Sequence, residues 1–191
     1  YEMLIGLVGS EMCIRDRYIW ESPSSSIEGV EFLRKKIKDY DGVIAVGSGT
    51  VSDSIKYATF LEKKSYSVFA TTPMNAYTTG TASISFDGIK KSLVAHYAQG
   101  VFFDLEVLSM CPKRLTAAAF ADVICRTTAQ VDWLMSHKIL KTDYQTAPYS
   151  LLALYEKDMI ESASLIAKGD IEALALLTRI SAIMGLGTSF T

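Results

Sequence analysis

The stretch Val43-Ile44-Ala45-Val46-Gly47-Ser48-Gly49-Thr50-Val51-Ser52-Asp53 predicts a strand, a tight turn and the start of a helix. Its first four residues are apolar and mostly β-branched, which indicates a fully buried strand. Val51, Ile55 and Ala58 then recur at helical spacing. Glycines let a ligand approach the backbone, and free N–H groups at a helix start favour a phosphate. The first hypothesis is that Gly47 to Val51 hold a dinucleotide pyrophosphate, although similar turns also occur without a ligand.

The composition of the 191-residue chain is that of a globular protein, with 49% hydrophobic and 21% charged residues. The net charge is -2 and no basic block is present, so nucleic acid is not an expected partner. No apolar run approaches the roughly 20 residues that span a bilayer, so we expect no membrane span. Cys13, Cys111 and Cys125 form no CxxC pair, which predicts free buried thiols in a reducing compartment such as the cytoplasm.

Residues 1–17 do not fit the pattern that follows them. Tyr1 to Gly9 have no recognisable strand partner or cap, and Gly9 to Arg17 resemble a translated sequencing-adapter read. We therefore interpret this segment as non-native and outside the fold. A genuine N-terminal strand is the alternative.

Residues 18–112 predict an α/β domain. An amphipathic helix is expected between Ser26 and Ile37, before the opening strand, and Ser67 to Ala70 indicate a second buried strand. A helix between two such strands predicts a parallel sheet, whose ligands bind at the carboxyl ends of the strands. Asp87-Gly88 suits a two-residue hairpin turn, and Gly100 to Asp104 indicate a further short buried strand.

Residues 113–191 predict a helical portion without strands. The expected helices are Leu115 to Leu140, Tyr149 to Ala167 and Ile171 to Met184. Between the last two, Gly169-Asp170 supply a C-cap and the next N-cap.

Asp122 stands among apolar residues of the first of these helices and therefore needs a partner. An i,i+4 ion pair with Arg126 and a role as metal ligand are the two interpretations, and the residues alone favour the ion pair. His96 and His137 are the only histidines and lack a metal-binding spacing, so both are expected to be surface or packing residues. His137 lies about four turns beyond Asp122, too far along a straight helix to share its ion.

Four motifs together resemble the sn-glycerol-1-phosphate dehydrogenase group of the iron-containing alcohol dehydrogenase and dehydroquinate synthase-like superfamily. They are Gly47 to Asp53, Thr71 to Thr78, Asp87 to Lys91 and Phe120 to Val123. The resemblance covers about Ser26 to the C-terminus. It implies a Rossmann-like NAD(P)-binding α/β domain followed by an all-α metal-binding domain. The implied activity is a metal-dependent, NAD(P)-linked dehydrogenase of a polyol or polyol phosphate, and a homo-oligomer is left open.

The resemblance also implies a set of site residues. The pyrophosphate of NAD or NADP would be held by Gly47, Ser48, Gly49, Thr50 and Val51. Asp53 would be the acidic position of the first helical turn, Thr71 and Thr79 would touch the cofactor, and Asn75 would lie near the substrate. Asp122 would be the aspartate ligand of a catalytic zinc or iron, which reverses the preference for an ion pair. Such a metal acts as a Lewis acid on the substrate hydroxyl while hydride moves to the nicotinamide.

The chain departs from this group at several places. Ser48 and Ala121 stand where glycine is usual, and the Thr71 loop lacks a small polar residue before Met74. The two histidine ligands of the group lie downstream of a glycine-rich stretch resembling Gly185 to Thr191. Because a catalytic zinc generally has three protein ligands, we expect this polypeptide as given to be inactive.

Two alternative functions stay open. A dehydroquinate-synthase-like cyclase would use the same cofactor and metal but needs several basic residues for phosphate and carboxylate groups. Lys90 and Lys91 are weak candidates for that role, because such lysines are more often solvated. A non-catalytic nucleotide-binding module is the other alternative.

Overall fold

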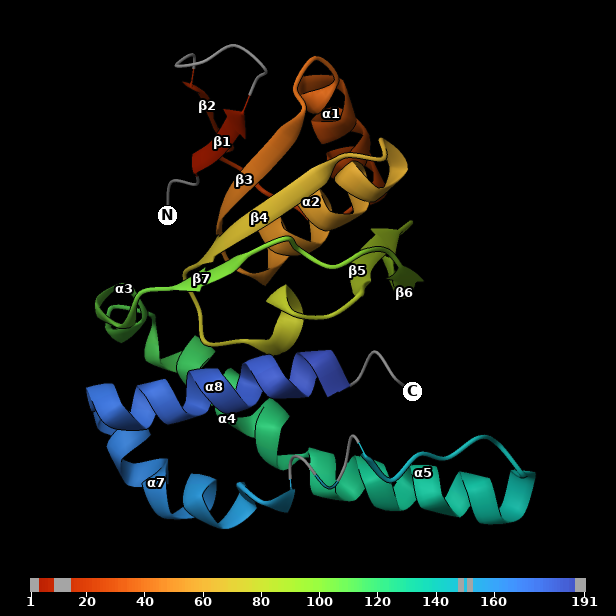
Figure 1. The fold of residues 1–191 in the computed structure, drawn as a ribbon, viewed down its shortest axis with the longest axis vertical. Helices are drawn as coiled ribbons and strands as arrows, with labels where there is room; N and C mark the ends of the chain where they lie inside the picture. The colour runs from red at the N-terminus through yellow and green to blue at the C-terminus, as the bar shows by residue number, and fades with distance from the viewer. Residues whose placement is uncertain (1–3, 9–14, 148–149, 151–152, 188–191) are drawn as a thin grey trace. The chain divides into compact units, whose positions relative to one another are not determined.

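The computed structural model describes residues 4–8, 15–147, 150 and 153–187 (Figure 1). The chain divides into two compact units: Tyr1–Thr71 with Ala76–Phe103, and Thr72–Asn75 with Asp104–Thr191. The domain limit expected at residue 112 lies within the second of these units.

The first unit is built on a five-stranded sheet with the strand order β2-β1-β3-β4-β7. Strands β3 (Gly42–Gly47) and β4 (Ser65–Ala70) run parallel, as the sequence predicted, and β7 (Val101–Phe103) adds to β4 in the same direction. Gly47 lies opposite Ala70 in the β3–β4 register. The carboxyl ends of these two central strands therefore lie side by side.

Strands β1 (Leu4–Val8) and β2 (Arg15–Ile19) extend the sheet in the antiparallel sense. The expectation that residues 1–17 have no strand partner is wrong, because Ile5 lies opposite Ala45 of β3. Pairing of this kind requires only the free backbone groups along the edge of β3, which side-chain periodicity does not reveal. The non-native origin of the segment stays a prediction.

The described part of the first unit contains two α-helices, of which one packs on the five-stranded sheet and the other packs on that helix. Helix α1 (Ile27–Ile37) begins after Ser26, whose hydroxyl accepts a hydrogen bond from the Gly29 N–H at 3.2 Å. Helix α2 (Gly49–Leu61) packs on β3 and β4, and α1 packs on α2 (Figure 1). The resulting core is made of apolar side chains from both helices and the parallel strands. They include Val30, Leu33, Ile37, Val43, Ala45, Val51, Ile55, Ala58, Val68 and Ala70.

Strands β3 and β4 are buried on one face and β7 has no buried residue, so the expectation of fully buried strands is wrong. Alternate residues of β3 and β4 are buried, whereas Ile44 is 41% exposed. In β7, Phe102 is 57% exposed. The strands read as continuous apolar runs because apolar residues stand on both of their faces. Helix α2 covers only the face that carries Val43 and Ala45, so the apolar residues of the other face stay at least partly exposed.

The hairpin predicted around Asp87-Gly88 is confirmed. Strands β5 (Thr81–Phe86) and β6 (Ile89–Val94) form a separate two-stranded antiparallel sheet. Asp87 and Gly88 have φ values of 50° and 80°, which the two-residue turn requires. Before the hairpin, residues 75–77 form the short 3₁₀ helix η1 (Asn75–Tyr77).

The second unit is helical in its described part. Its helices are α3 (Leu105–Ser109), α4 (Lys113–Ile124), α5 (Arg126–Leu140), α7 (Glu156–Lys168) and α8 (Ile171–Gly187). Helices α4, α7 and α8 enclose a core that includes Val123, Met159 and Leu177. Gly169 ends α7 with φ 81°, and Asp170 Oδ1 accepts from the Ala173 N–H at 3.0 Å, so both predicted caps are confirmed.

Two of the expected helices differ from the observed ones. The predicted helix Leu115 to Leu140 is two helices that meet at Cys125, where the hydroxyl of Thr128 donates to the Cys125 carbonyl at 2.7 Å. Such a side-chain bond competes with the helical backbone bonds and bends the chain. Within the predicted helix Tyr149 to Ala167, Ser150 and Ala153 are helical, Leu154 and Tyr155 form a turn, and α7 begins at Glu156; residues 149, 151 and 152 lie outside the described residues.

Two of the three cysteines, Cys111 and Cys125, lie among the described residues. Cys111 and Cys125 are both free, but only Cys111 is buried, so the expectation of buried thiols is wrong for Cys125. Cys125 is exposed because it lies at the α4–α5 junction instead of on an inner helix face. Cys13 lies outside the described residues.

None of the helices in the described part is long and apolar enough to cross a membrane.

Candidate functional site

The candidate site lies where β3 and β4 end next to each other in the first unit. The N–H of Thr71, directly after β4, donates to the Gly47 carbonyl at the end of β3 at 3.1 Å. The two polar loops that the sequence placed at the carboxyl ends of parallel strands are therefore joined by a backbone hydrogen bond. This edge is where open parallel sheets bind their ligands.

The start of α2 has the features of an anion site. Ser48 is its N-cap residue, and the Ser48 side chain makes no capping hydrogen bond. The Val51 and Ser52 N–H groups both donate to the Ser48 carbonyl at 3.1 Å, whereas the first N–H groups of a helix have no acceptor within it. The N–H groups of Gly49 and Thr50 therefore point out of the helix end, where its dipole also favours a negative charge.

Gly49 provides a test of whether a phosphate fits this turn. Its φ lies outside the left-handed region, so backbone conformation alone does not require glycine. A Cβ added to Gly49 would meet only the Cβ of Ala76, at 3.6 Å, which is an ordinary van der Waals contact. The fold thus has room for a methyl group at Gly49, and a ligand that approaches the backbone closely is what would require the side chain to be absent. A glycine that the fold itself does not require is compatible with a pyrophosphate at this turn, and pyrophosphate binding here stays a prediction.

Asp53 lies in the second turn of α2, since the helix begins at Gly49. The expectation of an acidic residue in the first turn is therefore wrong, because the helix starts two residues earlier than the apolar spacing from Val51 suggested. The Asp53 side chain is 13% exposed, and its Oδ1 lies 3.7 Å from the Lys56 Nζ. Burial raises the pKa of Asp53, and the Lys56 ammonium opposes this shift. A contact between Asp53 and the cofactor stays a prediction.

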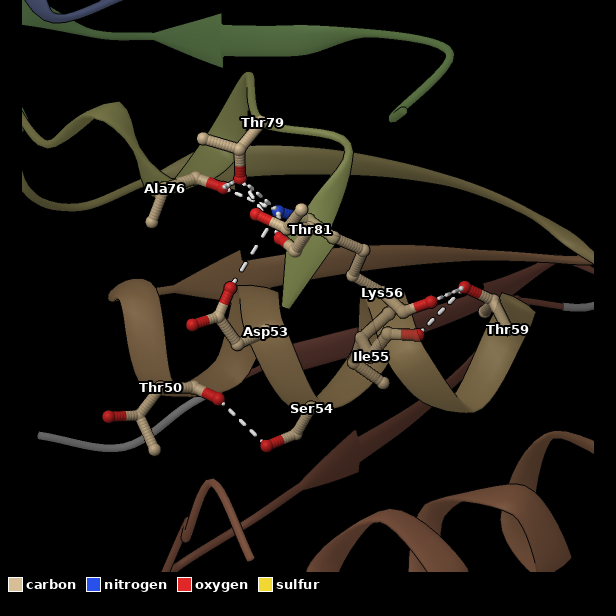
Figure 2. Close-up of polar contacts among 9 residues, drawn as sticks. All are labelled: Thr50, Asp53, Ser54, Ile55, Lys56, Thr59, Ala76, Thr79 and Thr81. Atoms are coloured by element: carbon tan, nitrogen blue, oxygen red, sulfur yellow. Dashed lines mark hydrogen bonds and ion pairs between the residues drawn. The ribbon is translucent and has the colours of Figure 1, made fainter. Parts of the chain in front are cut away.

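Lys56 is a residue of this region that the sequence reading missed. Its side chain is fully buried, and its Nζ contacts η1 and the segment that follows it (Figure 2). Thr79, expected to touch the cofactor, is one of its partners at 2.9 Å. A lysine between Ile55 and Ala58 on the inner face of α2 was the available signal, because charged residues are rarely buried without partners.

His96 is a packing residue, as expected. Its Nε2 lies 2.9 Å from the Thr59 Oγ1, and its ring centroid lies 5.1 Å from that of Tyr66. Burial lowers the pKa of His96, and the Lys56 ammonium adds to this effect. In the second unit, the His137 Nδ1 contacts the Thr142 carbonyl at 2.6 Å, which makes it a local contact at the end of α5.

Asp122 lies near the end of α4 in the second unit. Its Oδ1 is 4.0 Å from the Arg126 Nη2, and both side chains are about one-third exposed. This i,i+4 pair is the ion pair that the residues alone suggested. Among the described residues, no group of three or more His, Cys, Asp or Glu side chains could hold a metal. These residues alone do not form a metal site, and the role of Asp122 as a ligand stays a prediction.

The remaining candidates are placed as follows. Asn75 opens η1 and belongs to the second unit, so its contact with a substrate stays a prediction. Lys90 and Lys91 on β6 are exposed, as expected of solvated lysines. The Lys91 Nζ lies 5.5 Å from the centroid of the Phe86 ring, a contact within the hairpin.

The sequence profile of iron-containing alcohol dehydrogenases matches residues 8–112, which is more than half of the chain. The chain belongs to this family. The family match includes β3, the turn, α2 and the hairpin, and it begins within the segment that the sequence reading set aside. Asp122 lies beyond it.

Individual relatives agree with this family assignment. The chain is 32% identical to a glycerol-1-phosphate dehydrogenase [NAD(P)+] of Pyrococcus abyssi, covering 92% of this chain and 51% of the relative. The enzyme of the same name from Geobacillus thermodenitrificans is 28% identical, covering 85% and 42%. The chain thus spans about half the length of these curated relatives.

A solved structure shows the same fold for this part of the family. Sulfoacetaldehyde reductase from Bifidobacterium kashiwanohense, determined in complex with NAD+, superimposes with a TM-score of 0.72 at 18% identity. The similarity covers 87% of this chain and 50% of that one. The predicted fold class, an α/β nucleotide-binding portion followed by helices, is confirmed by this likeness.

Proposed function

We propose that the protein is an NAD(P)-linked dehydrogenase that oxidises a polyol phosphate of the glycerol 1-phosphate type. The observation that carries the proposal is the start of α2, where a helix end without a side-chain cap and a glycine that the fold itself does not require lie at the carboxyl ends of parallel strands. The names of the glycerol-1-phosphate dehydrogenase relatives support both the cofactor and the substrate class.

In this proposal, the chain's own residues bind and orient the cofactor. The N–H groups of Gly49 and Thr50 donate to the pyrophosphate, and Gly47 and Val51 shape the turn on either side. Ser48 donates through its backbone N–H, which a serine provides as well as a glycine does, and its side chain makes no capping hydrogen bond. Thr71 lies at the same edge, joined to Gly47 by its N–H. When bound, the nicotinamide supplies the hydride acceptor.

Asp122 is the one metal ligand that we propose on this chain. A single aspartate does not hold zinc or iron in water, since catalytic zinc sites generally have three protein ligands. The chemistry assigned to the described residues is therefore cofactor binding. We propose that the 191-residue chain binds NAD(P) without turning over substrate by itself.

Calorimetric titration of the chain with NADH and NADPH tests the cofactor role. We expect saturable binding of at least one of them, and binding of neither would contradict the proposal. Incubation with NAD+ or NADP+, zinc and sn-glycerol 1-phosphate tests whether the chain turns over substrate by itself. Turnover would contradict the proposal that it does not.

The substrate class needs a separate assay on the protein as its source organism makes it. We expect faster nicotinamide reduction with sn-glycerol 1-phosphate than with sn-glycerol 3-phosphate or glycerol. A preference for unphosphorylated glycerol would show that the polyol phosphate assignment is wrong.

A further inference from the structure

Lys56 is a fully buried lysine whose ammonium group is saturated by one short segment of chain. Its Nζ donates to the Ala76 carbonyl at 2.6 Å, to the Thr79 Oγ1 at 2.9 Å and to the Thr81 carbonyl at 2.9 Å (Figure 2). An ammonium has three donors, and these three acceptors match them. The Asp53 carboxylate, at 3.7 Å, supplies the opposite charge from the same helix.

Burial of this charge is costly, and its position therefore needs an explanation. Desolvation lowers the pKa of Lys56 to about 8, so the group still carries its proton at neutral pH. A well-packed apolar side chain would fill the same volume without that cost. What an apolar side chain would not provide is a fixed position for three oxygen atoms between residues 76 and 81. The polar contacts specify the course of this segment, which carries little regular structure before β5.

The hydroxyl of Thr79 is part of the same arrangement. It accepts from Lys56, and its own proton lies between two acceptors, the Ala76 carbonyl at 3.1 Å and the Thr81 carbonyl at 3.0 Å. A threonine hydroxyl has one proton to donate. Because that proton is engaged within the segment, an effect of Thr79 on a cofactor is better explained by the shape of the segment than by donation to the ligand.

The segment borders the proposed pyrophosphate turn at two points. Ala76 is the residue whose Cβ lies 3.6 Å from the position of a Cβ on Gly49. The Tyr77 hydroxyl donates to the Gly47 carbonyl at 3.1 Å and is buried. The residues that Lys56 holds in place therefore form one wall of the turn.

We propose that Lys56 is a positioning residue that fixes the segment Ala76–Thr81 against α2 and thereby shapes the cofactor turn. Lys56 does not touch the cofactor in this role; it acts through Ala76, Tyr77 and Thr79. The inference rests on the proposed function for its consequence, cofactor affinity, but the positioning itself is a property of the free protein.

The test compares the chain with Lys56→Met and with a matched control, Lys64→Met. Lys64 is also a lysine that donates to two backbone carbonyls, those of Lys38 at 2.6 Å and Tyr40 at 2.5 Å. It precedes β4 and so lies at the amino end of this strand, whereas the turn lies at the carboxyl ends of the strands. Amide hydrogen exchange of residues 76–81 and the Kd for the preferred reduced cofactor are measured for each protein.

We expect Lys56→Met to speed exchange in residues 76–81 and to weaken cofactor binding roughly tenfold or more, since small displacements in a binding site have large effects. Lys64→Met should leave both unchanged even if it lowers Tm. Unchanged exchange in Lys56→Met, with the fold intact by circular dichroism, would overturn the proposal. If Lys56→Met does not fold, Thr79→Val removes the shared hydroxyl at similar volume and should give the same two changes.

The two proposals fail in different ways. If the unmodified chain binds neither NADH nor NADPH, the proposed function is wrong, and the exchange measurement still decides the role of Lys56. If the unmodified chain binds cofactor but Lys56→Met binds it equally well, the positioning role toward the cofactor is wrong and the proposed function stands.

Discussion

The Asp122–Arg126 pair should contribute little to stability. The two charges are 4.0 Å apart and each side chain is about one-third exposed, a setting in which helical ion pairs are worth about 0.5 kcal/mol or less. We expect Asp122→Ala to change the free energy of unfolding in urea by no more than this, like the control Asp132→Ala at an exposed site on α5. A loss of about 2 kcal/mol or more would show that Asp122 has a structural role that the ion pair does not explain.

Lys56 should make the stability of the protein depend on pH above neutrality. Burial lowers its pKa from 10.5 to about 8, so between these values the unfolded chain binds a proton that the folded chain has released. The free energy of unfolding therefore rises with pH in this window, and the stabilisation is lost as pH falls through about 8. From pH 7 to pH 9.5 the rise should be roughly 2 kcal/mol.

Urea unfolding at both pH values, in the chain and in Lys56→Met, measures this contribution. The variant lacks the titrating group, so its stability should change less over the same range. The Asp53 carboxylate opposes the shift of the Lys56 pKa, the Lys56 ammonium lowers the pKa of His96, and Asp53 and His96 are present in both proteins. Equal pH dependence in the two proteins would contradict a lowered pKa for Lys56.

At the residue scale, the sequence predicted the turn better than its surroundings. Gly49 and Thr71 could be placed because glycine and a strand end have local signatures. Lys56 could not, because its partners follow it by 20 residues or more and are two backbone carbonyls and a hydroxyl. Every residue has a backbone carbonyl, so the residue types in the segment do not indicate such a contact.

The C-terminus of α7 is an element whose end depends on one residue. Gly169 has φ 81°, and no atom lies within 4 Å of where its Cβ would be. Replacement by alanine would therefore cost only the left-handed conformation, about 1 to 2 kcal/mol. We expect Gly169→Ala to lower the free energy of unfolding by that amount in a urea titration, and Gly169→Asn to lower it less, because asparagine tolerates this conformation. Equal losses in both variants would indicate that backbone conformation is not the cause.

At the element scale, strong local sequence signals were enough to predict that a helix or hairpin exists, but not the residues at which it begins and ends. The hairpin and the α7–α8 caps were predicted from Asp87-Gly88 and Gly169-Asp170, whose conformations are set by adjacent residues. The break at Cys125 is accompanied by a side-chain hydrogen bond from Thr128, which a hydrophobic period does not show. The half-exposed faces of β3 and β7 depend on which elements cover the sheet, and that is a tertiary property.

At the scale of the molecule, the class of fold could be predicted because strands and helices segregate along the chain. The pairing of β1 with β3 could not, since antiparallel addition to a sheet edge uses backbone groups that every sequence provides. The metal site was predicted only through the resemblance, and the described residues add the ion pair of Asp122 but no cluster of ligands. The proposed binding of NAD(P) can be tested directly on this chain.

Gly49→Ala is the most direct test of cofactor binding at the α2 turn. The free fold has room for the added methyl group and no strained φ, so Tm should stay the same or rise slightly. The same methyl group would occupy the space of the pyrophosphate, at a cost of about 1 to 3 kcal/mol, or roughly fivefold to 150-fold in Kd. We expect calorimetry to show this weaker binding of the reduced cofactor in a variant as stable as the unmodified chain. An unchanged Kd in Gly49→Ala would contradict a pyrophosphate site at this turn.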